Sequence, residues 1–304
     1  MPRTTKDLMY NTVILQDEHK FSFKKVEKHT HPFPYAIIEN PFEEAENIER
    51  DFPSMDNVKS SLRMDKDITY PSEIYLNLLS ESAVYAKIHN TMYSSNFISE
   101  IINLFQDEIK INLHNKKLLV DPFRSNLIGT PLETVIQSYG KRVHSTKRSS
   151  FFYPRIDLGA GGAGYGLNNG GAGIHTDNQT RLISILYYVN TPEKMKGGDH
   201  RLYEIANKSP LLHRAISPKR GAMIASLQTN YALHNVDPII TIDGYRKAFY
   251  IAISCNNQLW TREEDWLMKL TKNRAGELGT VPPLPIRIKS KIKRQLSKIL
   301  QKDV

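Results

Sequence analysis

A histidine and an aspartate two residues apart, His175 and Asp177, offer metal-binding chemistry at the end of a glycine-rich segment. In an extended strand, side chains alternate between the two faces, so this spacing predicts an imidazole and a carboxylate on the same side. One more histidine would complete the two-histidine, one-carboxylate set that holds non-haem Fe(II) and leaves coordination positions open. Three candidates follow in the chain, namely His200, His213 and His234.

His234 is the preferred third ligand because it lies in a short extended run, residues 231–236. A turn at residues 243–244 follows, and then comes Arg246. We expect this arginine on the antiparallel strand next to that of His234, so that its guanidinium reaches the cavity of the metal ligands. A buried guanidinium requires an anion, and its planar fork suits a carboxylate. Lys247 is the alternative cation, since strand alternation lets only one of these neighbours face inward.

The glycine-rich segment, residues 159–173, holds eight of the chain's 16 glycines. Residues 159–164 match the G-x-G-x-x-G dinucleotide fingerprint, which requires a helix to begin at its third glycine. The residues from Tyr165 to Gly171 are too rich in glycine and asparagine to form that helix. We therefore interpret the segment as a flexible lid or a close-packed turn over the site, with a tolerated surface insertion as the alternative.

The first half of the chain predicts one strand and a layer of helices. Residues 36–38 predict a short strand, and Asn40 and Pro41 are suited to the N-cap and first position of a helix that ends near Phe52. Between residues 72 and 114, apolar side chains at helical spacing predict two or three helices packed as an outer layer. Residues 130–136 fit a strand or a helical turn equally well.

From residue 149 onward, short β-branched and aromatic runs alternate with turns. They predict strands at residues 151–158, 181–189, 200–205, 222–226, 232–236, 239–242 and 247–255. Many short strands at regular spacing indicate a sandwich or a barrel. Residues 261–273 predict a helix, and a proline-rich break precedes a final basic helix. The expected organisation is a support layer at 1–148, a β core at 149–256 that forms one fold with it, and C-terminal helices at 257–304.

The order of His175-x-Asp177, His234 and Arg246 resembles the Fe(II)/2-oxoglutarate-dependent dioxygenase superfamily, and more closely its prolyl-4-hydroxylase-like branch. The flanking runs at 33–42 and 182–190 are similar as well, and the resemblance covers about residues 30–256. It implies an α+β fold, in which a double-stranded β-helix (jelly-roll) barrel is flanked by N-terminal helices and a basic C-terminal helix.

The resemblance also implies a chemistry. His175, Asp177 and His234 would hold Fe(II), and 2-oxoglutarate would chelate it while Arg246 pairs the other carboxylate. O2 would convert the co-substrate to succinate and CO2 and hydroxylate an unactivated carbon, and ascorbate can serve as reductant. The carboxylate at position 177 favours hydroxylation, because related halogenases leave that ligand position vacant.

Further residues are candidates for binding roles. Tyr153 and Tyr165 are both candidates for assisting 2-oxoglutarate binding. Arg155 is a candidate for contacting substrate, with a solvated barrel residue as the alternative. Four aromatic residues are expected in the barrel core, namely Tyr187, Tyr188, Phe249 and Tyr250.

Composition narrows the setting of this chemistry. With 304 residues, 40% of them hydrophobic, the chain can bury a sizeable core. Cys255 is the only cysteine and the first 20 residues are too polar for a signal peptide, so a reducing cytoplasm is expected. No run of about 18 apolar residues occurs, which predicts no membrane span. The net charge of +9 predicts attraction to an anionic partner.

A basic tail, residues 286–302, combines an apolar stripe with surrounding lysines and arginines. Such a helix can lie on an anionic membrane at its cytoplasmic face or dock on the protein itself or a second subunit. The membrane alternative makes a glycan or lipid-linked sugar a plausible substrate. A nucleic-acid substrate is disfavoured, since Ala252 stands where related dealkylases repeat an arginine. A peptidyl prolyl hydroxylase and a non-catalytic jelly-roll sugar-binding module remain alternatives, and the oligomeric state is open.

Overall fold

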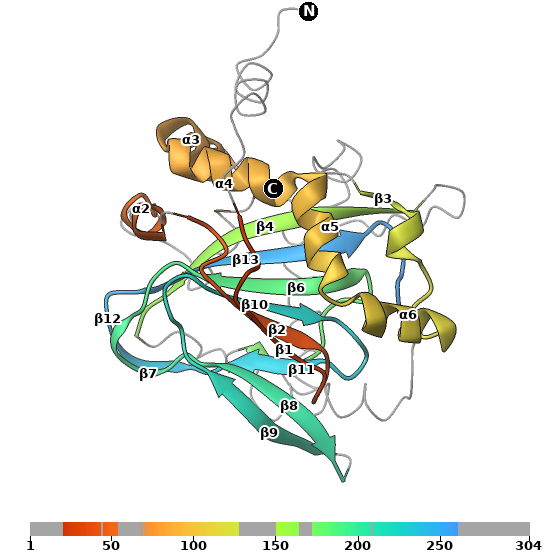
Figure 1. Cartoon of the computed structure of the whole chain (residues 1–304). Helices are drawn as coiled ribbons and strands as arrows, with labels where there is room; N and C mark the ends of the chain where they lie inside the picture. Colours follow the sequence, from red (N-terminus) through yellow and green to blue (C-terminus); the bar gives the residue numbers. More distant parts are fainter. Residues whose placement is uncertain are drawn as a thin grey trace, which may run out of the picture.

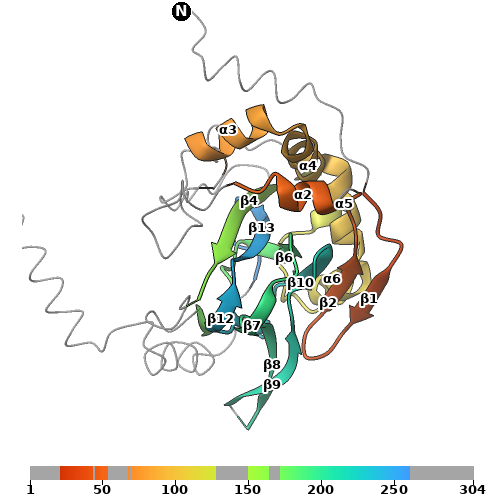
Figure 2. The ribbon, with the colours of Figure 1, turned by 90° about the vertical axis from the view of Figure 1, so that its left-hand side faces the viewer.

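The computed structural model describes residues 21–43, 45–53, 68, 70, 72–127, 150–163, 172–207 and 209–260. Within these ranges two antiparallel sheets face each other, and helices cover the far side of the larger one (Figures 1 and 2). The sequence predictions for residues 130–136, the helix at 261–273 and the basic tail at 286–302 lie outside the described residues.

The larger sheet contains seven strands in the order β1-β2-β10-β6-β13-β4-β3. Their bounds are β1 Val26–His29, β2 Tyr35–Glu39, β3 Asn126–Leu127, β4 Phe151–Gly161, β6 Arg181–Tyr188, β10 Ala222–Leu227 and β13 Arg246–Cys255. All neighbours pair antiparallel except β3 with β4. Because β2 pairs with β10, the N-terminal strands and strands of the later β-rich region belong to the same sheet.

The smaller sheet contains four strands in the order β5-β11-β8-β9. Their bounds are β5 Ala172–His175, β8 His200–Ala206, β9 Ser209–Ile216 and β11 Leu233–Val236, and a separate pair consists of β7 Glu193–Gly197 and β12 Ile239–Asp243. From β4 to β13 the chain passes repeatedly between the two sheets, which is a jelly-roll-like arrangement. The strand predicted at 36–38 is part of β2, and the seven strands predicted from residue 149 onward are all present, each within three residues of its expected bounds.

Five α-helices and one 3₁₀ helix are described. Their bounds are α2 Ala45–Arg50, α3 Glu73–Glu81, α4 Ala83–Tyr93, α5 Ser95–Asn103 and α6 Gln106–His114, with the 3₁₀ turn at Pro122–Arg124. The prediction of two or three helices between 72 and 114 was wrong, because three breaks divide this run into the four helices α3 to α6. Phe105 departs from helical backbone geometry, and Ser82 and Ser94 have extended backbones. Each hydroxyl accepts a backbone N–H from the next helix, at Tyr85 and Phe97 respectively. None of the helices in the described ranges is long and apolar enough to cross a membrane.

The main hydrophobic core lies between these helices and the outer face of the larger sheet. Ile156 and Leu158 of β4 are fully buried there together with Ile88 of α4 and Phe97 of α5. Strand alternation then turns the intervening residues of β4 to the inner face, toward the smaller sheet. The site is therefore built on the inner faces of both sheets.

The helix predicted to begin at Asn40 begins at Ala45 instead. Asn40 adopts a positive φ of 46° and donates its N–H to Gly221 O at 2.8 Å, so it continues the contacts of β2. Phe42 then forms an isolated bridge with Phe21 and is buried. These tertiary contacts of residues 40–42 override the local capping signal.

Two predictions about irregular segments were also wrong. The glycine-rich segment does not leave the barrel at Gly159, because Gly159, Ala160 and Gly161 continue β4 and pair with β13. No strand was predicted between residues 206 and 221, but His213 lies there on the edge strand β9. Most side chains of β9 are exposed, so the strand lacks the alternation of apolar and polar residues that would have indicated it.

Candidate metal centre and cavity

His175, Asp177 and His234 lie together at the rim of the smaller sheet. His175 ends β5 and faces His234 directly across the β5–β11 pair, with ring centroids 4.6 Å apart. Asp177 follows two residues after the strand. The Nε2 atoms of His175 and His234 lie 4.0 and 3.7 Å from its two carboxylate oxygens, and the three ligand atoms lie within 4.8 Å of one another.

Both imidazoles are held by backbone carbonyl groups. His175 Nδ1 lies 2.6 Å from Gly173 O and His234 Nδ1 lies 2.9 Å from Ala232 O. A carbonyl only accepts, so each Nδ1 carries a proton, which leaves Nε2 as the nitrogen with the lone pair in the neutral ring. Burial lowers the pKa of His234 to about 4, so this ring is neutral at physiological pH. Neutral rings fixed in this way are typical of metal-binding histidines.

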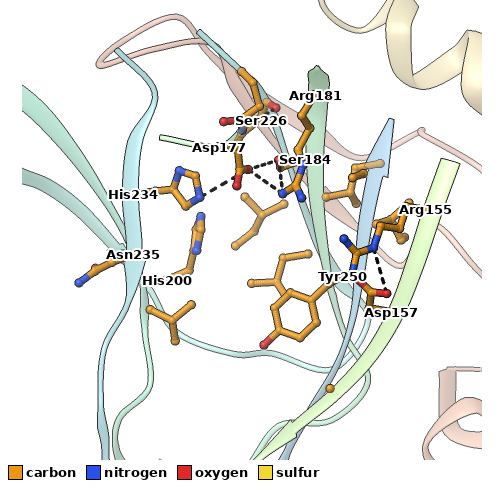
Figure 3. Close-up of a pocket in the computed structure, with 18 of the residues that line it drawn as sticks. Arg155, Asp157, Asp177, Arg181, Ser184, His200, Ser226, His234, Asn235 and Tyr250 are labelled. Atoms are coloured by element: carbon orange, nitrogen blue, oxygen red, sulfur yellow. Dashed lines mark hydrogen bonds and ion pairs between the residues drawn. The ribbon is translucent and has the colours of Figure 1, made fainter. Parts of the chain in front are cut away.

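Asp177 is anchored by the larger sheet. Ser184 Oγ of β6 donates a hydrogen bond to Asp177 Oδ2, and Arg181 Nη1 lies 2.9 Å from the same oxygen (Figure 3). Burial alone would raise the pKa of Asp177, but Arg181, His234 and the Ser184 hydrogen bond outweigh it and hold that pKa below its usual range. The carboxylate is therefore ionised beside the neutral imidazole of His234.

The donor set fits a divalent transition metal. Donors about 2.1 Å from one ion lie about 3.0 Å apart when they occupy one face of its coordination sphere. The separations of 3.7 and 4.0 Å between His234, His175 and the Asp177 oxygens exceed that spacing by about 1 Å or less. The three residues can thus hold an ion through small side-chain movements.

A cavity of about 350 Å³ lies beside these ligands, between the two sheets. The metal-ligand candidates and Arg155, Asp157, Ser184, His200 and Tyr250 line it, together with apolar side chains (Figure 3). On the larger sheet, Tyr250 pairs with Asp157 and Ala252 with Arg155. Arg155 and Asp157 therefore form the polar end of the cavity, and Tyr250 and His200 form its inner part.

Arg246 lies behind the cavity. Its side chain is 1% exposed, and it donates from Nη1 to Gly198 O at 2.8 Å and from Nη2 to Tyr250 Oη at 3.0 Å. Arg246 is on β13 of the larger sheet and His234 is on β11 of the smaller one, so the expectation of neighbouring strands was wrong. Lys247 points to the opposite face, with Nζ 5.3 Å from the Phe52 ring centroid.

His200 occupies the inner part of the cavity and was considered from sequence only as a metal ligand. Its ring centroid lies 5.6 Å from that of His234, and it is not part of the three-residue ligand group. Its side chain is buried, and its Nδ1 atom has no hydrogen-bond partner within the described ranges. Burial lowers the pKa of His200 to about 3, and the neighbouring His234 and Arg246 contribute to the same shift. His200 is therefore a neutral polar group facing the cavity.

The remaining candidates on β4 differ in their positions. Arg155 lines the cavity, and its Nη2 lies 2.9 Å from Asp157 Oδ2. Tyr153 is on the same face of β4 but does not line the cavity. Tyr165 lies outside the described residues.

Tyr250 was expected in the barrel core but lines the cavity, whereas Tyr187, Tyr188 and Phe249 are buried as predicted. The spacing of four residues from Arg246 places both side chains on one face of β13, a signal that the sequence contained. Gly159 makes room for the ring, because a Cβ atom there would lie 2.4 Å from Tyr250 Cε2. Gly159, near the C-terminal end of β4, thus leaves the space that the Tyr250 ring occupies.

No protein-family model matches the sequence, and no curated protein matches it significantly. Among solved structures, the protein is similar to a prolyl 4-hydroxylase from Phytophthora capsici, with 15% identity over 93% of this chain and 77% of that chain and a TM-score of 0.39. A Pseudomonas putida prolyl-4-hydroxylase shares 18% identity over 33% of this chain, with a TM-score of 0.25, and the match spans half of that enzyme. A 2OG-Fe(II) oxygenase family protein from Burkholderia pseudomallei shares 14% identity over 48% of this chain and 70% of its own, with a TM-score of 0.26. These proteins belong to the group that the sequence motifs resemble.

Proposed function

We propose that this protein is an Fe(II)- and 2-oxoglutarate-dependent dioxygenase that hydroxylates an unactivated carbon of its substrate. The observation that carries the proposal is the convergence of His175, Asp177 and His234, with both Nδ1 atoms bonded to backbone carbonyls and both Nε2 atoms within 4.0 Å of an ionised carboxylate. Two imidazoles and one carboxylate form the donor set of non-haem Fe(II) oxygenases and leave coordination positions open. When bound, iron with 2-oxoglutarate and O2 would supply the oxidising chemistry and release succinate and CO2.

The inner part of the cavity supports a place for 2-oxoglutarate. Arg246 Nη2 donates to Tyr250 Oη, so the tyrosine hydroxyl proton is available for donation to an anion in the cavity. His200 adds a neutral imidazole beside it. In this proposal Tyr250 and His200 contact the carboxylate group of 2-oxoglutarate that is not bound to iron. The Arg246 guanidinium, which donates to Tyr250 Oη, supplies positive charge on the far side of the tyrosine hydroxyl. Tyr153 does not line the cavity, and Tyr165 lies outside the described residues, so neither adds support for the same role.

The polar end of the cavity supports a place for substrate. Arg155 is more exposed than Asp157, with which it pairs, and both line the cavity. A guanidinium at that position can hydrogen-bond hydroxyl groups or carbonyl groups of an entering molecule. We therefore retain a glycan or lipid-linked sugar as the substrate hypothesis, with peptidyl proline as the alternative. Membrane contact through residues 286–302 stays a prediction.

The proposal is tested by succinate formation from 2-oxoglutarate. Metal-free protein is supplied with Fe(II), ascorbate and O2, and succinate is quantified with sugar acceptors, lipid-linked sugars or proline-containing peptides. Wild-type protein should form succinate faster with the correct class, and Asp177→Ala should form none above the protein-free background. A succinate rate that is the same in wild type and Asp177→Ala would contradict the proposal.

A further inference from the structure

A second group of metal-ligating side chains lies outside the cavity. It consists of His31 in the connection between β1 and β2, Glu204 on β8 and His213 on β9, whose ligand atoms lie within 4.8 Å of one another. His31 Nε2 lies 2.8 Å from Glu204 Oε2. The rings of His31 and His213 meet edge to face, with centroids 4.8 Å apart and an interplanar angle of 83°.

The strand register explains how His213 reaches this group. Tyr203 pairs with Leu212 and Leu202 pairs with Arg214, so His213 is an extra residue at a bulge between β8 and β9. A bulge re-aims the side chain that it carries. Here it brings a second imidazole beside the His31–Glu204 pair. Neither nitrogen of His213 has a hydrogen-bond partner in the part of the chain that the structure describes.

A surface ion pair between His31 and Glu204 would explain those two residues but not the third. His213 gains no hydrogen bond from its position, and protonation of both imidazoles would place like charges beside each other. The nearest cation of β9, Arg214, is directed to Glu27, with Nη1 at 3.1 Å from Oε1. A bound cation coordinated by neutral imidazoles and the Glu204 carboxylate accounts for all three side chains.

We propose that His31, Glu204 and His213 form a second metal site, which binds Zn²⁺ or a similar divalent first-row transition metal. Two imidazoles and one carboxylate, with a fourth position left to water, are a recognised zinc donor set. Tetrahedral zinc would place its donors about 3.4 Å apart, from bond lengths of about 2.1 Å. The His31 side chain is 64% exposed, so it can rotate to that spacing without a movement of the backbone.

This site is separate from the iron site and does not depend on the proposed function. On β8, Leu202 pairs with His234 and is buried in a cluster with Phe33, Tyr35 and Ala232. Glu204 lies two residues further along the same strand. A bound ion would tie the β1–β2 connection to the β8–β9 hairpin. Ligands that bind only the folded state stabilise it, so zinc should stabilise this edge of the smaller sheet.

The test measures the number of zinc ions bound per chain. Full-length, untagged, metal-free protein is dialysed to equilibrium against micromolar Zn²⁺ and its metal content is then determined. The double variant His175→Ala/Asp177→Ala removes the iron site and serves as the background. That background should bind one zinc ion per chain. Adding His213→Ala, or Glu204→Gln, which keeps a hydrogen-bonding group but removes the charge, should weaken zinc binding at least tenfold. Adding His114→Ala, an exposed histidine at the end of α6, should leave it unchanged.

The proposal is overturned if the background binds no zinc, or if His213→Ala and Glu204→Gln bind it as tightly as His114→Ala does. A second measurement covers the case of altered folding. Zinc should raise the thermal midpoint of the background and of its His114→Ala form, and it should leave that of the His213→Ala form unchanged. His213→Ala alone should retain iron and 2-oxoglutarate binding, which separates failure of this site from failure of the proposed function.

Discussion

Gly159→Ala tests whether the missing side chain at Gly159 leaves the space that the Tyr250 ring needs against β4, where the ring forms the inner part of the cavity. The added Cβ atom would lie 2.4 Å from Tyr250 Cε2, whereas ordinary contacts begin at 3.4 Å, so the ring edge must move by about 1 Å. The ring cannot move freely, because Tyr250 Oη accepts a hydrogen bond from buried Arg246. Overpacking of this kind typically costs about 1–3 kcal/mol. The loss of backbone freedom in the unfolded chain returns about 0.4–1 kcal/mol.

The net expectation is a loss of about 1–2 kcal/mol in the free energy of unfolding, measured by urea denaturation at constant m-value. Gly162→Ala is the matched control. Its Cβ atom would lie 3.0 Å from Tyr245 Cε1, but that ring is 42% exposed and can turn into solvent. The control should therefore remain within about 0.5 kcal/mol of wild type. Equal stability of the two variants would refute the account of Gly159.

Three further outcomes are expected. Ser184→Ala removes the hydrogen bond to Asp177 and should weaken Fe(II) binding about 10- to 100-fold. Ser217→Ala should not, because its hydroxyl bonds Asp199 and neither residue lines the cavity. His200→Ala should retain Fe(II) but bind 2-oxoglutarate at least about tenfold more weakly, as measured by anaerobic titration, because it loses a polar contact worth roughly 1.4 kcal/mol. Burial lowers the pKa of His89 to about 3. The unfolded chain therefore binds a proton below pH 6.5 that the folded protein does not, and stability should fall by about 1.4 kcal/mol between pH 7.5 and 5.5 through this residue alone.

Each of these outcomes has a contrary result. Unchanged iron affinity in Ser184→Ala would mean that Asp177 needs no support from β6. Loss of iron in His200→Ala would make His200 a metal ligand. The pH effect is assigned by comparing urea denaturation of wild type and His89→Gln at both pH values. An identical pH dependence in the two proteins would contradict the buried neutral state of His89.

The β core was accessible from sequence because its strands combine β-branched and aromatic residues with clear turns. The chain from residue 181 to 189 is an example, since most of its side chains are buried and it lies in the middle of the larger sheet. The helical layer was less accessible. Ser82 and Ser94 each end one helix and cap the next, and a periodicity that continues across a single residue does not show such a break.

The metal-ligand candidates could be proposed from sequence because His175 and Asp177 are close in the chain. Cross-sheet neighbours could not be found in this way. Arg246 meets Tyr250 along one strand, but its approach to His200 depends on how the two sheets face each other. Gly159 illustrates the same limit, because its purpose becomes visible only when the ring of Tyr250 is in place.

The most direct test of the central claim is an anaerobic optical titration of metal-free protein with Fe(II) and then 2-oxoglutarate. The chelate of these two components should produce a weak visible metal-to-ligand charge-transfer band in wild-type protein. His234→Ala and Asp177→Ala should lose the band, and Arg246→Ala should require more 2-oxoglutarate to reach it. Absence of the band in wild type, or a band of equal strength in His234→Ala, would contradict an iron and 2-oxoglutarate site at these residues.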